Sequence, residues 1–290
     1  MKTTLPTLAG LAVLLSACGG GTETETPADP PAVEAPAEPA AKEDTKVSES
    51  TTAGICVDAG PQTPRDITSV AGLNLADFPM APATSGMNLC NLHTHTNAEH
   101  KGPDFSVFVN DSDYGGYACN ATPELTEAEL APADGSFGKV KPGDTIEVHW
   151  VHTSCAATPG EGLGACVPEG CENPLLRDEA QTFLVVNDAD AANFMDFVYD
   201  GNQVDGLHQP KAIPASTGTP VVFRGSTTGP SYTQEACSPF SVTWSVRPGC
   251  MKLDINSLHA WADSDNVFNE TKSHGVRQLV TAPELLSPIE

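Results

Sequence analysis

Histidines gather in two short segments of this chain. Residues 91–95 read Asn-Leu-His-Thr-His, and residues 147–152 read Glu-Val-His-Trp-Val-His. Side chains alternate between the faces of a β-strand, so two such strands side by side would bring His93, His95 and His149 together. Three neutral imidazoles suit Zn²⁺ and leave its fourth position open, and such a metal lowers the pKa of a bound water to about 7. The pattern therefore predicts a metal site that supplies hydroxide at neutral pH.

A polar residue stands two positions before a histidine in each segment. Asn91 precedes His93 and Glu147 precedes His149 at this interval, so each shares a strand face with its histidine. A metal-bound imidazole needs an acceptor for its second ring nitrogen, which fixes the tautomer and the orientation of the ring. We therefore expect Asn91 and Glu147 to accept hydrogen bonds from the ligands.

The elements that must position these residues are predicted to be mainly strands. Residues 146–152 are rich in β-forming types and follow a Lys-Pro-Gly-Asp turn signature. Further strands are expected at 181–186, 220–224 and 240–246. Helical patterns are scarce and predict short helices at 124–130 and 188–197. We expect a mainly β protein with a few short helices.

The first 53 residues have the composition of a targeting signal followed by a tether. Residues 1–17 combine Lys2 with an apolar run too short to span a bilayer, and Leu15-Ser-Ala-Cys18 resembles the lipobox of bacterial lipoproteins. The resemblance implies a signal peptide over 1–17 and a lipidated Cys18. Residues 18–53 are acidic and rich in Pro and Ala, which predicts a disordered tether. We expect an exported lipoprotein of the cell envelope, on the periplasmic or outer side of a bacterial membrane, with one folded domain at 54–290.

Cysteine content and net charge further limit the class of protein and the partners that it can bind. Eight cysteines follow Cys18, an even number that predicts up to four disulfides in an exported domain, and a thiolate zinc cluster is disfavoured because no C-x-x-C pair occurs. The formal net charge of −24, from 14 basic and 38 acidic residues, excludes a nucleic-acid-binding face. It also disfavours charge attraction to an anionic membrane, so membrane contact is expected through the lipid alone. The oligomeric state stays open.

Five short motifs occur in a fixed order along residues 62–244. They are QTPRDI from Gln62, NLHTH from Asn91, EVHWVH from Glu147, GSTTGP from Gly225 and VTW from Val242. The ordered set resembles the carbonic anhydrases, specifically the delta class, with similarity to the alpha-class motifs QSPxDI, QFHFHW, ELHLVH, GSLTTPP and VTW. The resemblance implies a central, largely antiparallel sheet and reversible hydration of carbon dioxide to bicarbonate by a zinc-bound hydroxide. One Zn²⁺ per chain would be held by His93, His95 and His149.

The same resemblance implies roles for residues around the metal. Glu99, followed by His100 as in the family, would polarise a gatekeeping threonine, and Thr227 or Thr228 would be that threonine. Thr228 and Val151 would line the pocket for carbon dioxide.

Four further points follow from the comparison with the alpha class. Part of 183–186, around Leu184, would form the other wall of the pocket. A Cys56–Cys237 disulfide would brace the threonine loop. The intervals around Glu99 and Thr227 are shorter than in the alpha class, which favours delta. No histidine matches the alpha-class proton shuttle, and His208, His259 and His274 have no assigned place.

Other functions compete with this one. His93, His95 and Glu99 also fit the H-x-H-x3-E spacing of a cupin, which would make Glu99 a metal ligand in an oxygenase or isomerase. A copper-binding cupredoxin is disfavoured because Cys and Met ligands at suitable spacing are missing. A non-catalytic, metal-binding envelope lipoprotein is the remaining alternative.

The lipid anchor gives the first testable prediction. Cys18→Ala removes the only thiol that the lipobox would modify, so the variant is expected in the soluble fraction, whereas the parent stays with membranes. Fractionation followed by immunoblotting measures this. A Cys18→Ala chain that remains with the membrane contradicts lipidation at Cys18.

Overall fold

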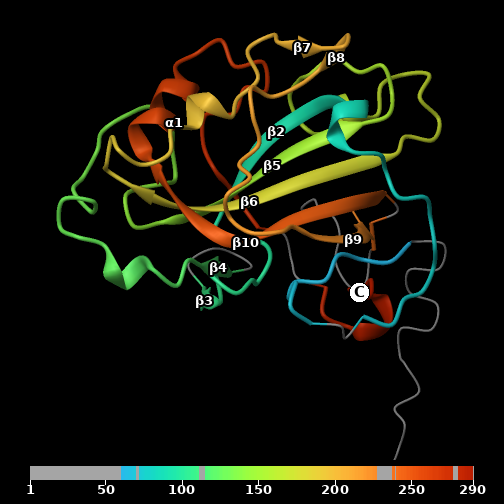
Figure 1. Ribbon diagram of the computed structural model, residues 1–290, viewed down its shortest axis with the longest axis horizontal. Coiled ribbons are helices and arrows are strands. Elements are labelled where there is room, and N and C mark those ends of the chain that lie inside the picture. The colour runs from blue at the N-terminus through green and yellow to red at the C-terminus, as the bar shows by residue number, and fades with distance from the viewer. Residues whose placement is uncertain are drawn as a thin grey trace, which may run out of the picture. The chain divides into compact units, whose positions relative to one another are not determined.

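A six-stranded mixed sheet forms the centre of the fold (Figure 1). The computed structural model describes residues 60–69, 72–110, 115–226, 237–238, 240–276 and 280–289. In spatial order the strands are β11 (His274–Gly275), β2 (Asn88–Thr96), β5 (Thr145–Thr153), β6 (Leu176–Val186), β10 (Ser241–Asp254) and β9 (Val221–Ser226). Three ladders are antiparallel, β2–β5, β5–β6 and β10–β9, while β10–β6 and β11–β2 are parallel. The predicted mainly β architecture is confirmed.

Smaller elements surround this sheet. Two hairpins pair β3 (Val107–Val109) with β4 (Gly116–Ala118) and β7 (Gln203–Val204) with β8 (Leu207–His208). The described residues contain one α-helix, α1 (Ile255–Ala262). Short 3₁₀ turns lie at Thr84–Gly86, Thr122–Glu124, Leu163–Cys166, Phe194–Asp196 and Pro283–Leu285.

The two predicted helices are wrong, and α1 was not predicted. Residues 124–130 form turns, and residues 188–197 contain only the turn at Phe194–Asp196. The first of these segments buries no residue, so it has no apolar face to stabilise a helix. In α1 the Asp254 side chain caps the first turn by accepting from the Asn256 N–H at 3.2 Å. Ile255, Leu258 and Trp261 repeat at helical spacing and are buried, which is the pattern that stable helices need.

The sheet buries both of its faces. One face packs with α1 in the main apolar cluster, which includes Trp150, Phe183 and Leu253. The other face carries the histidines beside a second cluster. All nine residues of β5 are buried, so the polar side chains of this strand need partners inside the protein.

Disulfides tie distant parts of the described chain together. They join Cys90 to Cys166, Cys119 to Cys250, and Cys155 to Cys171. These six cysteines are therefore paired with one another rather than free for a thiolate metal cluster. Cys237 is also disulfide-bonded, but Cys56 lies outside the described residues, so the Cys56–Cys237 pairing stays a prediction.

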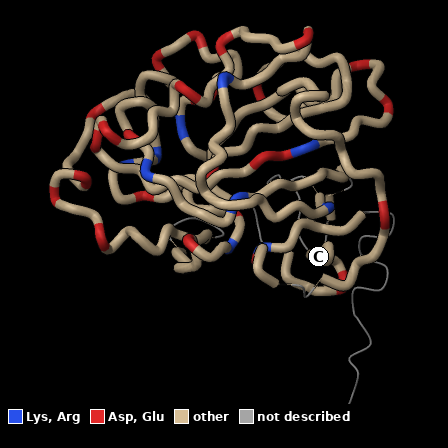
Figure 2. Tube along the Cα trace, in the orientation of Figure 1, with Lys and Arg blue, Asp and Glu red and all other residues tan. Residues whose placement is uncertain are grey.

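Several predicted features fall outside the described residues. They are the signal peptide over 1–17, Cys18, the tether over 18–53, Thr227 and Thr228. No helix in the described part of the chain is long and apolar enough to cross a membrane. Figure 2 shows acidic positions on many loops around the sheet and few basic ones, in keeping with the net charge.

Candidate metal centre

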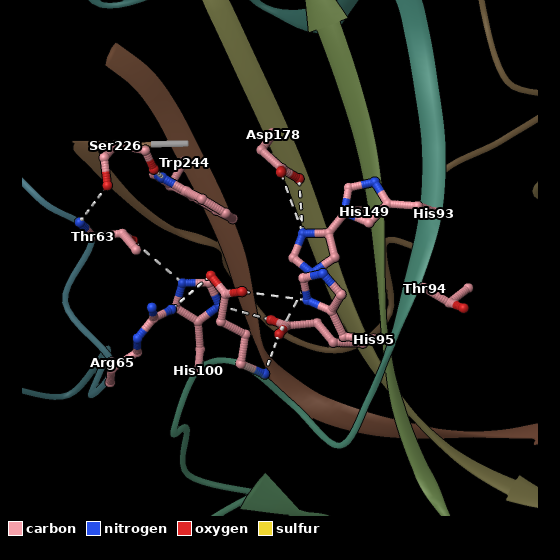
Figure 3. Close-up of polar contacts among 12 residues, drawn as sticks. Thr63, Arg65, His93, Thr94, His95, His100, His149, Asp178, Ser226 and Trp244 are labelled. Atoms are coloured by element: carbon pink, nitrogen blue, oxygen red, sulfur yellow. Dashed lines mark hydrogen bonds and ion pairs between the residues drawn. The ribbon is translucent and has the colours of Figure 1, made fainter. Parts of the chain in front are cut away.

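Strand pairing brings the three predicted ligands together. In the β2–β5 ladder His93 stands directly opposite His149, and His95 stands opposite Glu147. One ring nitrogen from each histidine lies within 4.8 Å of the other two, a spacing that one metal ion can bridge. His95 and His149 are buried, and His93 is half-buried. The predicted cluster is therefore present in the structure (Figure 3).

Asn91 contacts His93 as predicted. Its Oδ1 accepts from His93 Nδ1 at 2.7 Å, and its Nδ2 donates to the Gly160 carbonyl at 3.1 Å. Because the amide is fixed by Gly160, its oxygen faces the ring and selects the tautomer that carries a proton on Nδ1. His93 Nε2 is then free to bind a metal.

His149 lies between two carboxylates. Its Nδ1 is 3.2 and 3.3 Å from the two oxygens of Asp178, and its Nε2 is 3.6 Å from Glu147 Oε2. Burial opposes a charged ring, but Asp178 and Glu147 outweigh that effect and raise the pKa of His149 well above its ordinary value. Burial and the nearby His149 lower the pKa of His95 to about 3 and that of His93 well below its usual range. His93 and His95 are thus neutral, which is the form that binds metals.

Glu147 is held by donors on both oxygens. Oε2 accepts from the backbone N–H of Glu99, and Oε1 accepts from His100 Nδ1 at 2.8 Å. Burial alone would raise the pKa of this carboxyl, but His100 and His149 hold it well below its usual value. His100 Nε2 lies 3.4 Å from Thr63 Oγ1, which extends the chain of contacts to the QTPRDI segment. Glu147 was expected to accept from His149, but its hydrogen bonds come from Glu99 and His100, and His149 Nε2 stays 3.6 Å away.

Glu99 lies beside the cluster without joining it. Its Oε2 is 3.4 Å from His95 Nδ1, and its Oε1 is 2.6 Å from Arg65 Nη1. The carboxylate is fully buried, so its charge needs the guanidinium nearby. A cupin arrangement would require Glu99 to be a ligand in the cluster, and the geometry does not support it.

Arg65, Asp178 and Thr63 are site residues that the sequence analysis missed. Arg65 and Thr63 belong to the QTPRDI motif, which contributed to the family resemblance, but neither residue was assigned a role there. Asp178 comes from β6 and is the register partner of Val151 on one side and of Trp244 on the other. The signal that could have revealed it was an acidic residue two positions before Ala180 in a strand, because both side chains then share one face.

Trp244 closes the site from β10. Its ring meets His100 edge-on at 5.0 Å and His149 at 5.8 Å between centroids. The indole Nε1 donates to the Ser226 carbonyl at 2.9 Å, and Ser226 Oγ accepts from the Thr63 N–H at 3.4 Å. Ser226, the last described residue before the predicted gatekeeper, is thereby held next to the site.

The apolar residues that pack around Val151 do not include Leu184, which was expected there. Val151 packs in a cluster that includes Ala180, Trp244 and Val246, whereas Leu184 belongs to a separate cluster with Val186 and Cys119. The register explains the difference, because Ala180 stands opposite His149 and Leu184 stands opposite Thr145, four residues along β5. The structure does not bring Leu184 to Val151.

His274 is the histidine without an assigned place that lies beside His95. The two are register partners in the β11–β2 pair. His274 Nε2 contacts Glu270 Oε2 at 2.9 Å, and Glu270 Oε1 accepts from the Thr94 N–H at 3.0 Å. The contact with Glu270 raises the pKa of His274. This chain of contacts fixes the outer edge of β2.

Comparisons with known proteins find a matching family model and similar solved structures. A family model described as delta carbonic anhydrase matches residues 84–257, a range that includes all three clustered histidines. No curated protein matches the chain. One similar solved structure is an alpha-carbonic anhydrase from Thermovibrio ammonificans in complex with the inhibitor sulfanilamide. It has 14% sequence identity and a TM-score of 0.25, over 75% of this chain and 87% of that one.

The buried ion pair gives a prediction for stability. Arg65→Met removes the guanidinium from a fully buried carboxylate and should lower the free energy of unfolding by about 3–5 kcal/mol. Urea denaturation measures the loss. Lys101→Met is the matched control, because it breaks the partly exposed pair between Lys101 and Asp66, the residue after Arg65. It should change the free energy of unfolding by no more than about 1 kcal/mol. Equal effects of the two substitutions would contradict the role of Arg65.

Proposed function

Because the chain belongs to the delta carbonic anhydrase family, we propose that it catalyses the reversible hydration of carbon dioxide to bicarbonate and a proton, with one Zn²⁺ per chain. The observation that carries this proposal is the three-histidine cluster inside the residues that the family model matches. His93, His95 and His149 would hold the metal. A second function of another class is not favoured by any contact described above.

The residues present fit a zinc ion. Imidazole is among the ligands that zinc prefers, and three of them lie within bridging distance of one ion. His149 Nε2 is buried and makes no hydrogen bond among the described residues, so a buried nitrogen is available for a metal. When bound, zinc supplies a Lewis acid that turns water into a nucleophile at neutral pH.

The chain's own residues supply orientation. Asn91 fixes the ring of His93, and Glu147 and Asp178 flank His149. Arg65 holds the Glu99 carboxylate in place, and we assign Glu99 to accept a hydrogen bond from the hydroxyl of Thr227 or Thr228. A threonine held in this way would aim the nucleophile at the carbon of carbon dioxide, which is a positioning effect.

The surroundings suit an uncharged substrate and an exported protein. Val151, Ala180 and Val246 offer an apolar wall on which carbon dioxide can rest without losing polar contacts. The disulfides between described cysteines support export, because such bonds persist in oxidising compartments. We propose that the domain works outside the cytoplasm, attached to the membrane through Cys18.

Metal content measured together with carbon dioxide hydration tests the function. The purified protein should bind one zinc per chain and hydrate carbon dioxide in a stopped-flow assay. His149→Ala should lose both, because two imidazoles bind zinc much more weakly than three. His208→Ala is the matched control, since His208 contacts Tyr199 and lies outside the cluster. A zinc-loaded protein without hydration activity would contradict the proposal.

Substitution of Glu99 distinguishes two roles for this residue, an acid that orients the nucleophile and a ligand of the metal. Glu99→Gln keeps the shape of the side chain but changes its hydrogen bonding, so hydration should fall about 100-fold while one zinc per chain is retained. The measurement pairs stopped-flow kinetics with metal analysis of the same sample. Loss of zinc in Glu99→Gln would instead identify Glu99 as a ligand.

A further inference from the structure

Asp178 is a buried acid whose partner among the described residues is His149. Its side chain is 7% exposed, and its contacts within the described residues are those of both oxygens with His149 Nδ1. The other two acids of the site are compensated, Glu99 by Arg65 and Glu147 by the N–H groups of Glu99 and His100. No described Lys or Arg lies within 4.0 Å of the Asp178 carboxylate. Its charge therefore acts on the metal centre.

Register places this carboxylate beside the apolar residues Val151 and Trp244. Asp178 stands opposite Val151 on β5 and opposite Trp244 on β10, so it shares their face of the sheet. Opposed residues on neighbouring strands have their Cβ atoms about 4.5–5.5 Å apart. The apolar residues proposed to receive an uncharged gas thus have one acid beside them, and Figure 3 shows that acid pointing toward His149.

Asp178 is held beside the metal centre by its contacts with His149 Nδ1. If Nε2 binds the ion, Asp178 accepts the proton of Nδ1 from behind the ring. The carboxylate would then be separated from the ion by one imidazole ring, and a buried charge is weakly screened over that range.

We propose that Asp178 is a specificity-determining residue that weakens the binding of anions at the metal centre. The proposal rests on the proposed function, because it requires a bound metal ion. A carboxylate at this position attracts the metal cation and repels anions that approach the open position. Carbon dioxide carries no charge and is not repelled, whereas bicarbonate is. Asp178 thus favours release of bicarbonate and weakens the binding of competing anions.

Azide binding to the cobalt-substituted protein tests this directly. Azide is a small anion, and its binding changes the visible spectrum of Co²⁺, so the dissociation constant is read without an activity assay. Asp178→Asn removes the charge and keeps the shape, and it should bind azide about tenfold more tightly than the parent. Asp178→Ser removes the charge with a different neutral side chain, and its azide affinity should change in the same direction. Imidazole, a neutral ligand, should bind parent and variants within about twofold.

Glu179→Gln is the matched control for the loss of one acid from β6. Glu179 follows Asp178, points to the opposite face of the strand, and pairs with Arg177 at 2.6 Å. This variant should bind azide as the parent does. An unchanged or weaker azide affinity in both Asp178 variants overturns the proposal, as does an equal tightening in Glu179→Gln. Failure of the parent to bind Co²⁺ or to hydrate carbon dioxide would contradict the proposed function instead.

Discussion

The pairing of β2 with β5 places His93 directly opposite His149, and the rest of the site depends on that register. A shift of one residue would turn His93 and His95 to the other face of the sheet, into the main apolar cluster. The same register sets His95 opposite Glu147 and so brings the Glu99 segment to the same spot. Position on two neighbouring strands, β2 and β5, rather than on any loop, therefore defines the three-histidine cluster. Strands hold side chains more rigidly than loops, which suits a centre that must present a fixed open position.

Compensation of buried charge is the second condition for this site. Glu99 and Glu147 are fully buried, so each needs a donor or a cation that the fold supplies from elsewhere in the chain. Arg65 and Thr63 reach the site from the QTPRDI segment, and Trp244 supports it from β10. The motifs that are far apart in sequence are thus parts of one network. The acidic surface is a separate matter, because a neutral gas is not steered by charge.

The sequence predicted what depends on local spacing and failed where distant contacts decide. Period-two spacing was enough to find the three histidines, Asn91 and Glu147, because side-chain alternation is a property of one strand. Arg65 and Asp178 were missed because their importance comes from partners on other segments. Leu184 was expected at the pocket, but the register of β6 against β5 places it four residues away from Ala180. The helix expected at 124–130 did not form because that segment buries no side chain.

X-ray absorption at the zinc edge of the purified protein tests the central claim most directly. The claim is that three imidazoles from β2 and β5 hold one zinc ion and leave one position for a small ligand. The account predicts a shell of four nitrogen or oxygen atoms at about 2.0–2.1 Å, with the multiple-scattering pattern of three imidazoles. Sulfur at about 2.3 Å, or fewer than three imidazoles in the shell, would contradict it.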